Sequence, residues 1–176
     1  VGGMDTSLVK PFLRGRFHEA AGFVSLGAGI MLVAQCEDTL SRIAAIVYSL
    51  SLISLFAISG LYHRIQWSPK ARQWMRRLDH AAIFGLIAGT MTAVFLLALP
   101  REQSVKPLIL IWVISLVGMI QVLFWISAPK WVATIMYIGA GWMALPYLRE
   151  IGRTIGAFGS ARSEERRVGK ECRSRW

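Results

Sequence analysis

Charged residues are scarce in this 176-residue chain, and cysteine is scarcer still. Only 17% of the residues are charged, against about a quarter in an ordinary soluble domain. Apolar residues make up 55% of the chain, and the mean hydropathy is +0.49. This composition excludes a disordered chain and argues against a soluble domain. The two cysteines, Cys36 and Cys172, are too few for a disulfide framework.

Acidic residues are also few, with 10 Asp and Glu against 20 Lys and Arg. An excess of basic charge can indicate nucleic-acid binding. Here, however, the basic side chains occupy short gaps between long apolar runs instead of forming one stripe. We therefore expect no nucleic-acid partner.

Five long uncharged stretches dominate the sequence. They are Ala20–Cys36, Ile43–Tyr62, Ala81–Leu99, Leu108–Ala128 and Trp131–Leu148. Each is close to the roughly 20 residues that a helix needs to cross the hydrocarbon layer of a membrane. The runs are continuous instead of alternating, which favours helices over a β-barrel. The sequence therefore predicts an all-α, polytopic transmembrane bundle of five spans in a lipid bilayer.

The basic residues between the spans predict an orientation. The loop from 64 to 78 holds Arg64, Lys70, Arg72, Arg76 and Arg77, and the segment before the first span holds Lys10, Arg14 and Arg16. The loop after the first span carries Glu37, Asp38 and only one arginine. Because positive loops stay on the cytoplasmic side, we expect the N-terminus and the loop 64–78 in the cytoplasm.

The last 17 residues differ in kind from the rest. Residues 160–176 are densely charged, have no periodic apolar face and resemble translated vector sequence. We therefore predict a membrane domain over residues 1–159, incomplete at its C-terminus, and a disordered, non-native basic tail over 160–176.

Polar residues gather at one depth of the predicted bundle. Ser59 and His63 lie four apart near the end of the second span, so they share a helix face. Asp79 opens the third span at the same side. An ionisable group at membrane depth is a functional candidate because it is costly there. We predict that Ser59, His63 and Asp79 line one polar pocket.

Each of these residues also has a structural explanation. Asp79 could cap a helix N-terminus, His63 could interact with a helix C-terminus, and Ser59 could bond to the carbonyl four residues earlier. Three chemistries also stay open from the residue types alone. They are a Ser–His–Asp triad, a zinc site and haem ligation by two of the chain's histidines.

Two sequence motifs help to choose among these three chemistries. SGLYH at 59–63 is followed by a basic loop and by RRLDHAAIFGLIAGTMT at 76–92. Together they resemble the paired signature of the hemolysin III and adiponectin-receptor (PAQR) family. FHEAAG at 17–22 resembles the family's first helix more loosely.

The resemblance implies seven helices and a zinc site near the cytoplasmic leaflet. His63 matches a zinc-ligating histidine, Asp79 matches an aspartate that contacts zinc-bound water, and Ser59 matches a serine beside the site. The family is similar to alkaline ceramidases, which implies a zinc-dependent hydrolase of a lipid amide or ester. It also implies an integral protein of a bacterial inner (plasma) membrane.

This chain departs from the family pattern in one important way. The other two zinc ligands come from an H-x-x-x-H motif on the seventh helix, and this sequence has no such motif. GTMTA also replaces the usual GTYTP. We therefore expect an incomplete site and weak or absent zinc binding in this chain. A cytolysin or pore, and a receptor or sensor with structural zinc, stay open as alternative functions.

Overall fold

Five helices follow one another in the part of the chain that the structure describes. The computed structural model describes residues 15–125, 130–154 and 156. The helices are α1 (Arg16–Ala34), α2 (Thr39–Arg64), α3 (Pro69–Ala98), α4 (Arg101–Phe124) and α5 (Lys130–Trp142), and a short 3₁₀ turn, η1 (Leu145–Tyr147), comes after α5. No strand occurs within the described ranges. The predicted all-α bundle is therefore confirmed, while the tail 160–176 lies outside the described residues.

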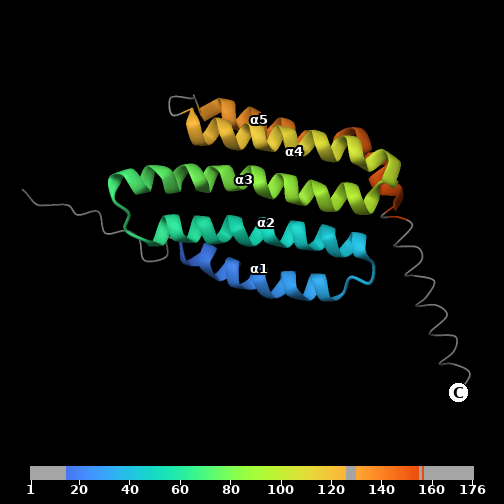
Figure 1. Ribbon diagram of the computed structural model, residues 1–176, viewed down its shortest axis with the longest axis horizontal. Helices are drawn as coiled ribbons and strands as arrows, with labels where there is room; N and C mark the ends of the chain where they lie inside the picture. The colour runs from blue at the N-terminus through green and yellow to red at the C-terminus, as the bar shows by residue number, and fades with distance from the viewer. Residues whose placement is uncertain (1–14, 126–129, 155, 157–176) are drawn as a thin grey trace, which may run out of the picture.

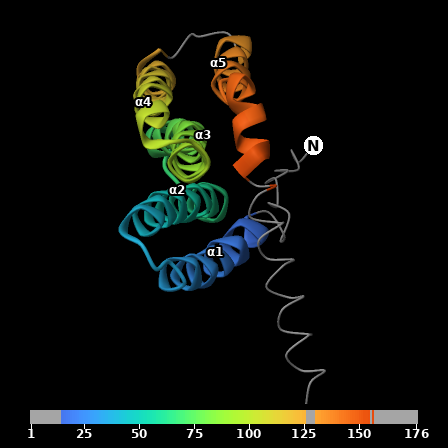
Figure 2. The same cartoon turned by 90° about the vertical axis from the view of Figure 1, so that its right-hand side faces the viewer.

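The helices form an open antiparallel arc. Each helix packs on the next one along the chain, and α5 also contacts α3. Figure 1 shows the helices running side by side, and Figure 2, seen along them, shows α1 and α5 at the two ends of the arc. As a result, the start of α1, the end of α2 and the start of α3 lie at the same end of the bundle.

The helices α2 and α3 extend beyond the uncharged stretches that predicted them. α3 starts at Pro69, well before Ala81, because Ser68 caps its N-terminus and accepts a hydrogen bond from the Ala71 N–H at 3.4 Å. Proline fits the first position of a helix, where its missing N–H is not needed. At the other end of the bundle Asp38 caps α2. The Ser41 hydroxyl and N–H donate to its carboxylate and hold the pKa of Asp38 below the usual value.

The fifth span is interrupted, although the sequence predicts one continuous run over Trp131–Leu148. α5 ends at Trp142, a 3₁₀ turn spans Leu145–Tyr147, and helix then resumes and reaches Thr154. Pro146 lies inside the turn and has no N–H to donate to an α-helical bond, which explains the break. The interrupted segment Trp131–Thr154 is still long and apolar enough to cross a membrane, as are the other four helices.

Small residues bring neighbouring helices together. A Cβ at Gly89 of α3 would lie 2.1 Å from Ser51 Oγ of α2, and a Cβ at Gly118 of α4 would lie 2.4 Å from the ring of Phe84. Phe84 itself is fully buried. Lipid supplies no hydrophobic drive for helix association, so close backbone approach of this kind holds membrane helices together.

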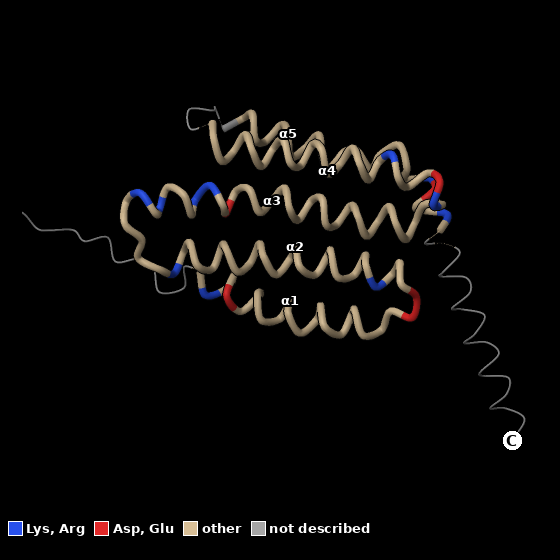
Figure 3. Tube along the Cα trace, viewed as in Figure 1, with Lys and Arg blue, Asp and Glu red and all other residues tan. Residues whose placement is uncertain are grey.

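Charged residues lie toward the two ends of the bundle and leave its middle bare (Figure 3). The α2–α3 turn and the helix ends beside it carry the basic residues Arg64, Lys70, Arg72, Arg76 and Arg77. Figure 3 also shows acidic positions on α1 and α3 toward the same end. The length and composition of the helices, together with this distribution, indicate an integral membrane protein.

Candidate functional site

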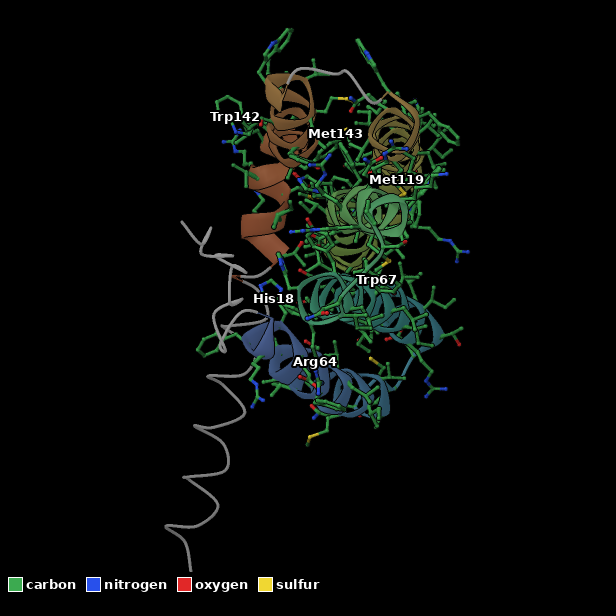
Figure 4. The ribbon with its side chains drawn as sticks, turned by 90° about the vertical axis from the view of Figure 1, so that its left-hand side faces the viewer. His18, Arg64, Trp67, Met119, Trp142 and Met143 are labelled. Carbon is green, nitrogen blue, oxygen red and sulfur yellow. The ribbon has the colours of Figure 1, made fainter. Side chains whose placement is uncertain are left out.

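The candidate site lies where α1 begins and α2 ends. Figure 4 views this end of the molecule, with His18 of α1 and Arg64 of α2 labelled. Ser59 and His63 occupy the last two turns of α2, one helical turn apart. Asp79 lies about three turns into α3, and that helix starts at the same end of the bundle.

His63 lies beside a second histidine, His18 of α1. Its ring centroid lies 5.9 Å from that of His18, and the two rings are tilted by 59°. Gly15, with φ of +89°, lets the chain pass directly beside His63, because a Cβ there would lie 2.9 Å from the His63 Cβ. His18 Nδ1 is buried and finds no hydrogen-bond partner within the part of the chain that the structure describes. The two helices thus bring two imidazoles together, one with an unused buried nitrogen.

An ion pair joins α1 and α2 at the same end of the bundle. The Glu19 carboxylate accepts a hydrogen bond from the Arg64 guanidinium. Both side chains are partly exposed, so the ion pair stabilises the contact between α1 and α2 by only about 0–1 kcal/mol.

Ser59 is buried, with 4% of its surface exposed. Its hydroxyl makes no hydrogen bond to the Leu55 carbonyl or to any other described residue, unlike Ser25 and Thr92, which bond to the carbonyls of Ala21 and Ala88. The structural explanation offered for Ser59 therefore does not apply.

Asp79 does not cap a helix, contrary to one interpretation of the sequence. Ser68 is the cap, and Asp79 lies well inside α3. Its carboxylate is partly buried and close enough to the Tyr137 hydroxyl of α5 to interact with it electrostatically. That hydroxyl donates to the His80 carbonyl at 3.1 Å. Asp79 therefore lies beside a contact between α3 and α5, which sequence reasoning missed.

The described residues do not form a zinc site by themselves. Within residues 15–125, 130–154 and 156, no three His, Cys, Asp or Glu side chains come together as metal ligands. In the same ranges, no hydrogen bond joins Ser59 to Asp79. The convergence of Ser59, His63 and Asp79 in one pocket thus stays a prediction.

A groove of about 450 Å³ between α1 and α2 begins at this site. Its polar end is formed by His18, Glu19 and Arg64. Its length is lined by apolar side chains, which include Phe23, Leu26, Ile53 and Phe56. A cavity that is polar at one end and apolar along its length suits a molecule with a polar head and an aliphatic chain.

Comparisons with known proteins agree with the motifs. A family described as "Haemolysin-III related" matches residues 6–168. "Hemolysin-3" of Bacillus cereus is 30% identical over 145 residues, which cover 81% of this chain and 66% of that protein. "Hemolysin-3 homolog" of Bacillus subtilis (strain 168) is 25% identical over 153 residues, which cover 81% of this chain and 71% of that protein. This chain thus spans just under two thirds of the length of the Bacillus cereus protein. No solved structure matches this chain significantly.

Proposed function

Because this chain belongs to the haemolysin-III-related family of membrane proteins, we propose that it forms five spans of a zinc-dependent hydrolase that cleaves a lipid amide or ester. In this proposal His63 is a zinc ligand, and Asp79 and Ser59 contact the substrate or the attacking water. Further ligands would be needed to complete the metal site, because the described residues bring no three His, Cys, Asp or Glu side chains together.

The groove between α1 and α2 is the observation that supports a lipid substrate most directly. Its apolar length would hold an acyl chain, and its polar end would place the amide or ester near His18 and His63. The Asp79 carboxylate would orient or deprotonate the attacking water, which is a task for a carboxylate within hydrogen-bond reach of that water. The buried Ser59 hydroxyl would donate to the scissile carbonyl.

Release of fatty acid by the purified complete protein tests the proposal. We expect hydrolysis of a long-chain N-acyl amide or ester in mixed micelles. Ala57 lines the groove and is exposed. Ala57→Phe should therefore raise the KM for long acyl chains by about tenfold, the effect of losing one or two buried methylene contacts. Ala28→Phe, at an exposed position outside the groove, is the matched control. No hydrolysis of either substrate class would refute the proposal.

The same proposal places the α2–α3 turn and the N-terminus in the cytoplasm of a bacterial inner membrane. It is supported by the basic residues at that end of the bundle. In a variant without native cysteines, we expect Gln103→Cys to react with a membrane-impermeant maleimide in intact spheroplasts. Gln66→Cys should react only after permeabilisation. Both glutamines are exposed, so the reverse pattern would overturn the orientation.

Cytolysis is a second candidate, because the relatives bear the name Hemolysin-3. One assay, with lipid vesicles that contain a trapped dye, distinguishes cytolysis from lipid hydrolysis. A cytolysin would release the dye whether or not Asp79 is changed to Asn, whereas a hydrolase would release fatty acid and depend on that carboxylate.

A further inference from the structure

A second cavity lies at the α2–α3 turn and belongs to a different surface. It measures about 370 Å³ and is lined by Tyr62, Trp67, Pro69, Arg72, Gln73 and Arg76. We call these six residues the headgroup pocket. It shares no lining residue with the groove between α1 and α2, so the hydrolase proposal does not account for it.

Two arginines give the headgroup pocket its charge. Arg72 and Arg76 lie one turn apart on α3, and like charges at this spacing repel each other. The structure records no acidic partner for either guanidinium among the residues it describes. Neighbouring arginines differ, because Arg64 pairs with Glu19, and Arg77 donates to the Leu123 carbonyl at 3.1 Å. An anion bound between Arg72 and Arg76 would remove the repulsion that the fold leaves in place.

Two aromatic side chains, Tyr62 and Trp67, contribute to the walls of the headgroup pocket. The Trp67 indole N–H donates to the Leu61 carbonyl at 3.1 Å, which holds the ring against the end of α2 (Figure 4). The Tyr62 ring packs against His63, with centroids 4.7 Å apart. Tryptophan and tyrosine with this placement at the end of a span are typical of the membrane–water interface. Such a placement of the two aromatic residues would set the cavity at the depth of lipid headgroups.

We propose that the headgroup pocket binds the phosphodiester of an anionic phospholipid in the leaflet on the side of the α2–α3 turn. The planar guanidinium forks of Arg72 and Arg76 match phosphate oxygens in geometry and charge. The Gln73 amide supplies a further donor to the glycerol or headgroup hydroxyls. Basic pockets next to membrane-spanning helices bind anionic headgroups in this way. The bound lipid would tie the start of α3 to the end of α2.

Lipid binding to the full chain in detergent micelles, followed by native mass spectrometry, tests this inference. Phosphatidylglycerol should bind at least about tenfold more tightly than phosphatidylcholine, because only the former carries net negative charge. The double variant R72Q/R76Q should weaken phosphatidylglycerol binding by roughly 30-fold, the product of two arginine contacts.

Lys70→Gln is the matched control for charge. Lys70 is exposed on the same turn of α3 but does not line the headgroup pocket. Its loss should weaken binding by no more than about fivefold, through the general field alone. Retained helical content in each variant shows that the fold is intact. Equal binding of the two lipids, or a K70Q effect as large as that of R72Q/R76Q, would overturn the inference. Displacement of the lipid by millimolar inorganic phosphate would instead show a soluble-anion site and would also overturn it.

Discussion

Alanine at Gly89 is expected to destabilise the bundle by about 2 kcal/mol, the middle of the range for overpacking. The new Cβ would lie 2.1 Å from Ser51 Oγ and 2.7 Å from Ser51 Cβ, and also 3.3 Å from the Val47 carbonyl oxygen. The Oγ can rotate away, but the Ser51 Cβ and the carbonyl cannot. α2 and α3 must therefore separate, which would also disturb the ends that carry His63 and Asp79.

Reversible unfolding in mixed detergent–SDS micelles, followed by circular dichroism, measures this effect. Gly139→Ala is the matched control, because a Cβ at Gly139 would meet nothing within 4 Å. Ser51→Gly in the same chain should rescue most of the loss in Gly89→Ala, since it removes the two atoms that collide most closely. A double-mutant cycle isolates that coupling. If G89A is as stable as G139A, the close α2–α3 contact is wrong.

Asparagine at position 79 of the complete protein is expected to lower lipid turnover by at least about 100-fold, as loss of a general base does. The amide keeps the shape of the carboxylate, so the neighbouring contact of Tyr137 with the His80 carbonyl should persist. It cannot accept a proton from water, however. The loss should therefore fall on kcat, with little change in KM.

Glu102→Gln makes the same change of charge at the opposite end of the bundle and should leave turnover unchanged. Fatty-acid release at saturating substrate gives kcat for both variants. An Asp79→Asn protein that keeps more than about a tenth of the wild-type kcat would remove Asp79 from the chemistry.

The spans could be predicted from the sequence because the absence of charge over membrane depth is a one-dimensional signal. The helix ends could not be predicted from the same signal. α3 begins at Pro69 because of a serine cap and a proline in a charged segment, and α5 stops at Trp142 because of Pro146. Both effects depend on local backbone chemistry, which hydropathy does not measure.

The sequence predicts that the candidate residues lie at one depth of the bundle, but it does not predict which side chains are in contact. The four-residue spacing of Ser59 and His63 and the antiparallel order of α2 and α3 follow from the sequence. The pairing of His18 with His63 depends on how α1 docks against α2, where Gly15 permits the close approach. No spacing within the chain encodes that docking, because the two histidines lie on different helices.

The interpretation of Asp79 as a helix N-cap was wrong. A favoured capping residue just before an apolar run is a reasonable N-cap in sequence terms. The structure places the cap eleven residues earlier, at Ser68, because the charged segment between them is also helical. An aspartate inside a helix is no longer explained by capping, and this strengthens its candidacy as a functional residue.

The zinc content of the purified complete protein, measured by inductively coupled plasma mass spectrometry, tests the central claim most directly. We expect about one zinc ion per chain, as three protein ligands and an open position require. We expect its loss in His63→Ala, and little or no zinc in the 176-residue chain, whose described residues hold no complete ligand set. A complete protein without zinc, zinc retained in His63→Ala, or stoichiometric zinc in the 176-residue chain would contradict the account.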